Sequence, residues 1–268
     1  MRNREFTRHG YIWTPTRRDL LKTAGGVLAT GLLAPRIARA ATFALLQHVS
    51  ANAASPTPSI DSTGADLLVW CHTRRGGASY VESPLTDSKG NLASAYTKLG
   101  PYNNGGDNAT VVIYALRGGT FGAGHTIPYG GANGAGADFV SVWSGSAASP
   151  IDQSAGFASA GNVSTIQPGS ITPTMPNELV IALLSDQAYP TDRTHSVDAS
   201  MTELDNLASP DYYYRGMIAY NIQTAAAAIN PTFTATGTAK NLAAMIVSFK
   251  STSSTSGGKV RHRVIGGY

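Results

Sequence analysis

The 268-residue chain predicts an all-β protein: a two-sheet β-sandwich of the jelly-roll or immunoglobulin-like kind, with an internal duplication. Apolar residues alternate with smaller ones at a spacing of two, as in Val112, Tyr114 and Leu116, which is the period of a half-buried strand. No stretch after the N-terminal leader keeps helical spacing for three turns. The alternating pattern also occurs a second time, 106 residues later, at Ile218 and Tyr220.

The duplication predicts how the strands are shared between the two halves. Residues 112–143 align with residues 218–249 without a gap, so that Thr126 falls on Thr232 and the run 139–143 falls on 245–249. An apolar strand that begins near Leu67 recurs near Leu179, at a lag of 112 residues. We therefore expect about four strands from each half, placed in two packed sheets.

The first 40 residues have the organisation of a signal peptide. In the segment TRRDLLK (16–22), the pair Arg17 and Arg18 resembles the twin-arginine export signal, with Leu20 where that signal prefers Phe. An apolar run over residues 23–34 follows, too short to be a stable membrane anchor. Ala38 and Ala40 provide the small residues of a signal-peptidase site, with cleavage before residue 41.

The resemblance to this export signal implies that the body folds before it crosses the membrane. Its transient partners are then the twin-arginine translocase and signal peptidase, and its destination is periplasmic or extracellular. The alternative is a basic, disordered N-terminus that happens to contain two adjacent arginines.

Residues 41–250 are expected to form one sandwich domain. A first strand is predicted over residues 42–50 and a second over 64–70, and the polar run TDSKGN (86–91) has the residues that close a hairpin. Residues 251–268 have the composition of a flexible Ser/Thr/Gly linker followed by a basic tail, which is either disordered or adds a strand to an edge.

Three segments carry a further resemblance. STGADLLV (62–69), TDSKGN (86–91) and QPGSITP (167–173) look like those of a widespread group of uncharacterised bacterial and phage-associated β-sandwich proteins. The likeness covers roughly residues 60–250. Its motifs belong to turns and core strands, so it implies a fold and transfers no catalytic residue.

The charge distribution disfavours a nucleic-acid partner. The net charge is +4, but the first 40 residues hold eight Lys or Arg against two Asp or Glu, whereas the remainder holds twelve against fourteen. A folded body that is mildly acidic lacks the basic face that phosphate binding requires. Because Cys71 is the only cysteine, neither an intrachain disulfide nor a zinc site built from thiolates is possible.

Exposed aromatic residues are the candidate ligand-binding residues. On a strand, Tyr213 faces opposite to its two neighbours, so at least one ring is expected to be exposed as a platform for a sugar ring. The alternative is that these tyrosines line the interface between the sheets. The proposed set is Tyr212, Tyr213, Tyr214, Arg215, Tyr102, Asn104 and Tyr129.

A cluster of aspartates is the candidate metal site. Asp186, Asp192 and Asp198 lie close together in the sequence with Arg193 and His195, and their oxygens suit Ca²⁺. Their spacing matches no calcium loop, and the histidines of the body lack the short spacing of metal-binding pairs. The sequence predicts no other cofactor.

The sequence favours an exported, non-catalytic β-sandwich that binds a carbohydrate or another cell-surface partner. The first alternative is a jelly-roll glycosidase or lyase. It would need two carboxylates about 5 to 10 Å apart in a groove, and Glu178 is the best placed of the glutamates. The second alternative is a structural subunit that assembles through edge strands or through the C-terminal segment.

Overall fold

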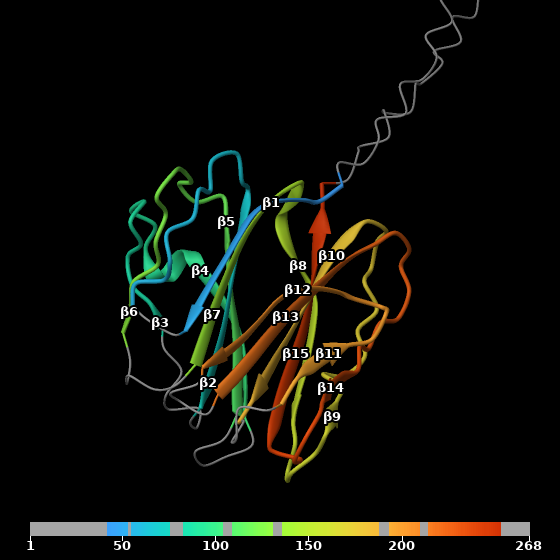
Figure 1. The fold of residues 1–268 in the computed structure, drawn as a ribbon. Helices are drawn as coiled ribbons and strands as arrows, with labels where there is room; N and C mark the ends of the chain where they lie inside the picture. The colour runs from blue at the N-terminus through green and yellow to red at the C-terminus, as the bar shows by residue number, and fades with distance from the viewer. Residues whose placement is uncertain are drawn as a thin grey trace, which may run out of the picture. The chain divides into compact units, whose positions relative to one another are not determined.

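The computed structural model describes residues 42–52, 55–75, 83–103, 109–130, 136–187, 193–209 and 214–252. These residues belong to one compact unit and form antiparallel strands joined by loops, with a short 3-10 turn, η2 (Ala93–Ala95). The predicted all-β sandwich is therefore confirmed (Figure 1). Among the described residues, no helix has the length and apolar character needed to cross a bilayer.

Five strands of the first half form one antiparallel sheet, in the spatial order β1-β7-β2-β5-β4. Its members are β1 (Ala44–Asn52), β2 (Leu67–Arg75), β4 (Tyr96–Asn103), β5 (Ala109–Arg117) and β7 (Gly136–Ser144). The three central strands β7, β2 and β5 are buried on both faces. This explains why their sequences are rich in Val, Ile and Leu.

Five strands of the second half form the other large sheet, in the order β8-β15-β10-β13-β12. Its members are β8 (Ser146–Ala158), β10 (Glu178–Asp186), β12 (Thr202–Ser209), β13 (Tyr214–Gln223) and β15 (Leu242–Ser251). When the five large strands of each half are numbered along the chain, both sheets have the spatial order 1-5-2-4-3. The predicted duplication is thus visible in the topology.

The register confirms the predicted lag for one pair of corresponding strands. Trp143 in β7 pairs with Leu67 in β2, and Phe249 in β15 pairs with Leu179 in β10. The 106 residues from Trp143 to Phe249 and the 112 from Leu67 to Leu179 are the two predicted lags.

The register corrects the prediction for the other pair. Ala115 of β5 pairs with Val69, and Tyr220 of β13 pairs with Ile181, so corresponding residues of these strands lie 105 positions apart instead of 106. A shift of one residue exchanges the two faces of a strand. Accordingly Tyr114 faces the outer side of the first sheet, whereas Tyr220 packs against the core between the sheets.

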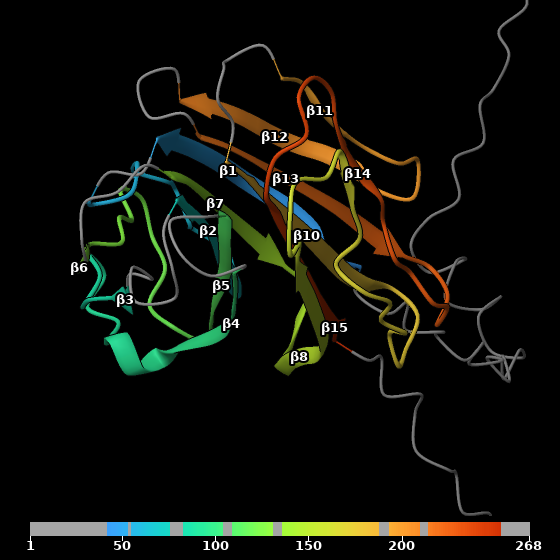
Figure 2. The ribbon, with the colours of Figure 1, turned by 90° about the horizontal axis from the view of Figure 1, so that it is seen from below.

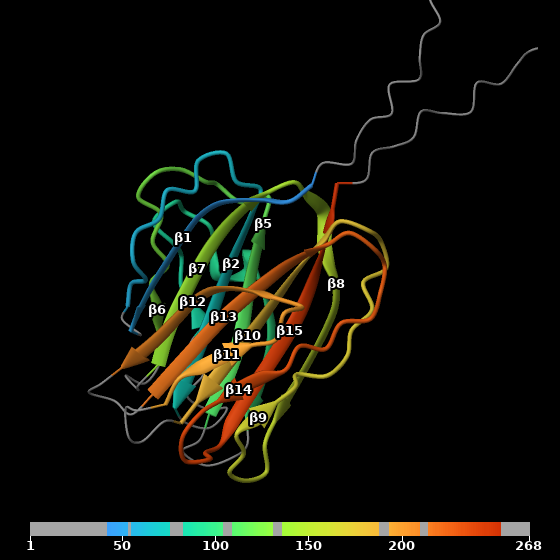
Figure 3. The same cartoon turned by 45° about the vertical axis from the view of Figure 1, so that its right-hand side comes forward.

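The two large sheets pack face to face and enclose the main core, and Figure 2 shows them side by side with covering segments outside each one. Loops and the short pair β3 (Ser83–Pro84) and β6 (Tyr129–Gly130) cover the outer face of the first sheet. A small sheet of β11 (His195–Val197), β14 (Phe233–Ala235) and β9 (Thr165–Ile166) covers the second (Figure 3).

The covering layers are also duplicated. Pro84 pairs with Tyr129 in the first half, and His195 pairs with Ala235 in the second. Pro84 and His195 lie 111 residues apart, and Tyr129 and Ala235 lie 106 apart, which is close to the lags of 112 and 106 that relate the large strands. The polar run 86–91 does not close a hairpin, which corrects that expectation: β3 pairs with β6, and β4 pairs with β5. The run forms a turn, with Gly90 at φ +83°, that lies in the outer layer.

Candidate functional site

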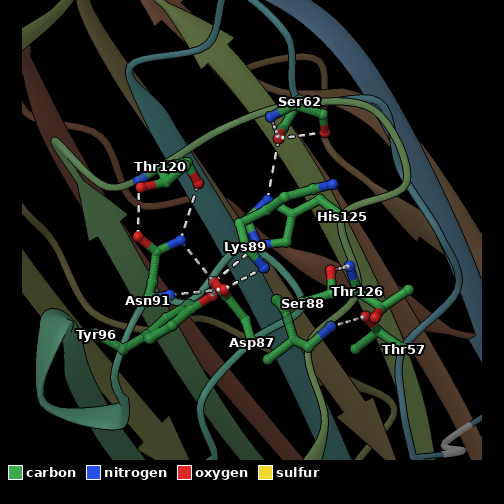
Figure 4. Close-up of polar contacts among 12 residues, drawn as sticks. Thr57, Ser62, Asp87, Ser88, Lys89, Asn91, Tyr96, Thr120, His125 and Thr126 are labelled. Atoms are coloured by element: carbon green, nitrogen blue, oxygen red, sulfur yellow. Dashed lines mark hydrogen bonds and ion pairs between the residues drawn. The ribbon is translucent and has the colours of Figure 1, made fainter.

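The outer layer of the first sheet is organised around the carboxylate of Asp87 (Figure 4). Its Oδ1 accepts the backbone N–H groups of Lys89 and Asn91 at 2.8 and 2.9 Å. Its Oδ2 accepts the Asn91 amide at 2.8 Å, the Tyr96 hydroxyl at 2.7 Å and His125 Nε2 at 2.8 Å. The carboxylate therefore ties its own turn to the start of β4 at Tyr96 and to the distant loop that contains His125.

These contacts determine the protonation state of Asp87. Burial alone raises the pKa of this carboxyl, but the hydrogen bonds from Tyr96, Asn91 and His125 outweigh burial, and the pKa lies below its ordinary value. Asp87 is consequently ionised at neutral pH although only 5% of its surface is exposed.

Ser62, His125 and Asp87 have the connectivity of a catalytic triad. The hydroxyl of Ser62 lies 3.0 Å from His125 Nδ1, and Nε2 of the same ring contacts Asp87. However, Ser62 and His125 are fully buried, and the Ser62 oxygen also bonds both the carbonyl and the N–H of Gly122. A nucleophile must reach its substrate. The trio therefore holds the covering loops together, and His125 is a buried, hydrogen-bonded residue rather than a surface one.

A second buried polar network lies at one end of the first sheet. Asp138 accepts hydrogen bonds from Trp70 Nε1 at 2.8 Å, His72 Nδ1 at 2.6 Å and the Tyr129 hydroxyl at 2.8 Å. Arg74 Nε donates to His72 Nε2 at 3.0 Å, so His72 carries its shared proton on Nδ1. Burial raises the pKa of Asp138, but the electrostatic interaction with the His72 ring and the hydrogen bonds from His72, Trp70 and Tyr129 outweigh burial, and the pKa lies below its ordinary value.

The predicted metal residues engage protein groups instead of forming a cluster. Asp186 is buried and contacts Arg193 Nε at 3.2 Å and His195 Nε2 at 2.7 Å. Asp198 accepts the backbone N–H groups of Ser200 at 3.0 Å and Thr232 at 2.6 Å. Asp192 lies outside the described residues. Within those residues no three His, Cys, Asp or Glu side chains are grouped as metal ligands.

Most of the described aromatic candidates are enclosed by the fold. Tyr214 is 1% exposed and donates to Ser185 Oγ at 2.8 Å, and Tyr129 is buried against Asp138. Tyr102 packs partly buried against the main core and the backbone of Gly156. Tyr214 and Tyr129 therefore cannot offer an exposed face, because their rings fill the space between packed layers. The alternative interpretation, that tyrosines line the interface between the sheets, applies to Tyr214, whereas Tyr129 packs on the outer face of the first sheet.

Of the four other residues proposed for ligand binding, the structure describes one. Arg215 is half-buried in β13, and Asn104, Tyr212 and Tyr213 lie outside the described residues. So do the export residues Arg17, Arg18, Ala38 and Ala40.

Glu178, the carboxylate favoured for the glycosidase alternative, has Asp152 as an acidic neighbour. Burial, aided by the negative charge of Asp152, raises the pKa of Glu178. Asp152 is held ionised by Lys250, whose ammonium lies 2.9 Å from its carboxylate. Although the pKa values of the two carboxyls are shifted in opposite directions, Glu178 is fully buried and accepts the backbone N–H of Met175. Neither carboxyl lines the groove beside β8 that is described next.

A groove lies beside β8, on the outer side of the second sheet. It has a volume of about 660 Å³ and runs between β8 and the loop that follows β9. Phe157 lines the groove with 54% of its surface exposed. The other large exposed hydrophobic residues of the described chain are leucines. The other lining residues are Ala155, Gly156, Thr165, Ile166, Gln167, Pro168, Gly169, Asn230 and Thr232.

Polar side chains of the groove are fixed in place by their own hydrogen bonds. Gln167 Nε2 donates to Thr232 Oγ1 at 2.9 Å, and Asn230 Oδ1 accepts from Gly169 N–H at 3.1 Å. Each amide uses one end in this way and keeps its other end for a ligand. The arrangement is an aromatic face beside oriented amides.

Sequence reasoning missed this groove. The residues come from three distant segments, and the QPGSITP run was assigned only to a turn. The available signal was Phe157, a large aromatic in a stretch of Ser, Ala and Gly.

We compared the chain with protein-family models, with curated proteins and with solved structures, and none of the three comparisons found a match.

Proposed function

We propose that this protein is an exported, non-catalytic β-sandwich that binds a carbohydrate, or another cell-surface partner, in the groove beside Phe157. The observation that carries the proposal is this exposed aromatic ring in a groove of about 660 Å³ with oriented amides. Ligand sites combine apolar faces with a few placed polar groups and commonly have volumes of this order.

Chemistry of the groove suits a sugar ring. The C–H face of a pyranose stacks on an aromatic ring, while its hydroxyls exchange hydrogen bonds with amides. Phe157 supplies the ring, and Gln167 and Asn230 supply amides that can both donate and accept. None of the lining side chains is ionisable, so the groove favours an uncharged part of a glycan.

The glycosidase or lyase alternative draws on the opposite pKa shifts of the neighbouring carboxyls Asp152 and Glu178. We favour the binding function because the groove and these carboxyls involve different residues, and the buried Glu178 has no contact with the groove. A structural subunit is the second alternative. Size-exclusion chromatography with and without residues 251–268 separates it, since assembly through the tail would be lost on truncation.

A glycan array with purified protein tests the proposal. Phe157→Ala should reduce the affinity for any bound glycan about tenfold or more, since stacked aromatics rank among the strongest contributors to binding. Leu92→Ala is the matched control, because Leu92 is a 60% exposed hydrophobic residue away from the groove. Equal binding by wild type and Phe157→Ala would place the ligand elsewhere, and Tyr212→Ala with Tyr213→Ala is then the next pair to compare.

Export by the twin-arginine route is a separate part of the proposal. Replacing Arg17 and Arg18 together with lysine should leave the unprocessed precursor inside the cell, because the route reads the arginine pair. Cell fractionation shows where the protein accumulates. The mass of the N-terminal peptide shows whether residues 1–40 have been removed. Normal processing of the variant before residue 41 would argue against the route.

A further inference from the structure

Strand β8 contains a larger irregularity than its counterpart β1. In β8, Ile151 is opposite Phe249 and Ser146 is opposite Ser251, so residues 147–150 stand outside the regular ladder. In β1 the corresponding irregularity is a single extra residue, Leu46. Bulges of this kind redirect side chains and occur often beside functional sites.

The bulge faces the edge strand of the other sheet and leaves a cleft between them. The cleft has a volume of about 360 Å³, and residues of β4, β5 and the bulge line it. Thr97 lies on the core-facing side of β4 and is nevertheless exposed, which shows that the two sheets do not close over one another here. Ala115, buried at 3% exposure, forms part of the inner wall.

Arg117 lies at this cleft and is held in a fixed orientation. Its Nε donates to the carbonyl of Ala147 at 2.8 Å, and its Nη2 donates to the carbonyl of Ser146 at 3.1 Å. These two bonds use one edge of the guanidinium, so Nη1 and the second hydrogen of Nη2 can donate to a ligand. The bulge therefore presents an oriented cation to the cleft.

No described carboxylate neutralises this cation within ion-pair distance. Arg117 is the one charged residue among those that line the cleft. Asp66, at the same corner, accepts the backbone N–H groups of Gly145 and Ser146 at 3.0 Å each. An arginine partly withdrawn from water and without a counter-charge favours an anion that can accept two parallel hydrogen bonds.

We infer that the cleft between β4 and the β8 bulge is a second binding site, for a small organic carboxylate whose acid group pairs with Arg117. The volume suits a ligand the size of one sugar ring or one aromatic acid. The small side chains Thr97, Ala115 and Ala148 leave room for its body. This site shares no lining residue with the groove at Phe157, so the two can be tested independently.

Calorimetric titration with glucuronate and with glucose tests the inference, because the two sugars differ in the carboxylate. We expect saturable glucuronate binding, at least tenfold weaker binding of glucose, and weakening of glucuronate binding with added salt. Arg117→Gln should lower the glucuronate affinity about tenfold or more. Lys98→Gln, a charge removed from the other face of β4, is the matched control and should change it little.

A cleft-filling variant guards against an effect of Arg117→Gln on folding. Thr97→Phe places a ring in the cleft and leaves both carbonyl contacts of Arg117 intact, so it should block glucuronate while circular dichroism and melting temperature stay close to wild type. Three results overturn the inference: absence of saturable glucuronate binding, equal affinity for glucose, or full binding by both Arg117→Gln and Thr97→Phe. Competition by sulfate at equal concentration would likewise count against it, by showing a site for any anion.

Discussion

The two halves of the molecule share one framework and stabilise its outer faces with different chemistry. Each half forms a five-stranded sheet with the same strand order. The cover of the first sheet is built on the ionised Asp87 and its hydrogen bonds. The cover of the second combines an apolar cluster around the fully buried Phe233 with the ion pairs of Asp186 to Arg193 and His195. The shared framework therefore requires only pleated apolar segments, and the covers were free to diverge.

The edges of the sandwich differ in the same way. At one edge Ser50 of β1 donates to Asp205 of β12, which also contacts His48 at 3.1 Å. At the other edge the residue that corresponds to Ser50 is Gly156 of β8, and the ring of Tyr102 occupies the space beside it. Both the groove and the cleft adjoin this second edge, so the binding surfaces that we propose belong to what the halves do not share.

The largest predicted effect is on the apolar cover. Phe233→Ala should lower the free energy of unfolding by about 3–5 kcal/mol, because the lost ring leaves a cavity. Ile127 is the corresponding residue of the first half and is also buried. Ile127→Ala should lower the free energy of unfolding by an amount near the lower end of about 2–5 kcal/mol, because hydrogen bonds also hold the first cover on its sheet. Urea unfolding measures both. Phe157→Ala is the control for an exposed ring, and equal losses for Phe233 and Ile127 would contradict the difference between covers.

The polar cover should be sensitive to acid. Because the folded-state pKa of Asp87 is depressed, its contribution is present above the unfolded value of about 3.9 and is lost as the pH falls below it. Asp87→Asn should cost about 2–3 kcal/mol at pH 7, since charged acceptors make the stronger hydrogen bonds, and should cost less at pH 3. Unfolding free energies at pH 3 to 7 check this, with Asp198→Asn as the more exposed counterpart.

Asp198 also has a depressed pKa, since its hydrogen bonds with Ser200 and Thr232 outweigh the effect of burial. Asp198→Asn should therefore reduce the pH dependence of the unfolding free energy less than Asp87→Asn does. If the unfolding free energy of Asp87→Asn depends on acid pH as strongly as that of the wild type, the charge of Asp87 does not stabilise the fold.

At the aromatic edge, Gly156→Ala should cost about 1–3 kcal/mol by overpacking, because its Cβ would overlap the Tyr102 ring. A double-mutant cycle with Tyr102→Ala measures the coupling. If the ring is the cause, the alanine at position 156 should be much less costly when Tyr102 is absent. Additive costs would assign the effect to the strand itself.

The smallest effect is expected at the polar edge. Ser50→Ala removes one hydrogen bond to a half-exposed carboxylate and should cost about 1 kcal/mol. Ser149→Ala, at an exposed position of the β8 bulge, should change stability by less than about 0.5 kcal/mol. A cost at Ser50 as large as that at Gly156 would remove the distinction between the two edges.

Several residues show how far sequence reasoning reached. The strands that begin near Leu67 and Leu179 were predictable, because runs of β-branched and aliphatic residues bounded by Gly and Asp have few other stable forms. The alignment of Tyr114 with Tyr220 was wrong by one position. Identical residue types cannot fix a register when each strand is apolar on both faces, because the alternation that normally marks the buried face is then missing.

The sequence by itself determined the all-β class and the duplication, since both follow from the period of apolar residues along the chain. Only the tertiary structure decided which aromatic residues are accessible. Tyr214 and Phe157 are both aromatic residues on strands, and the first is enclosed by the opposite sheet while the second borders a groove. Exposure depends on what packs against a residue from elsewhere in the chain, and the local pattern carries no record of it.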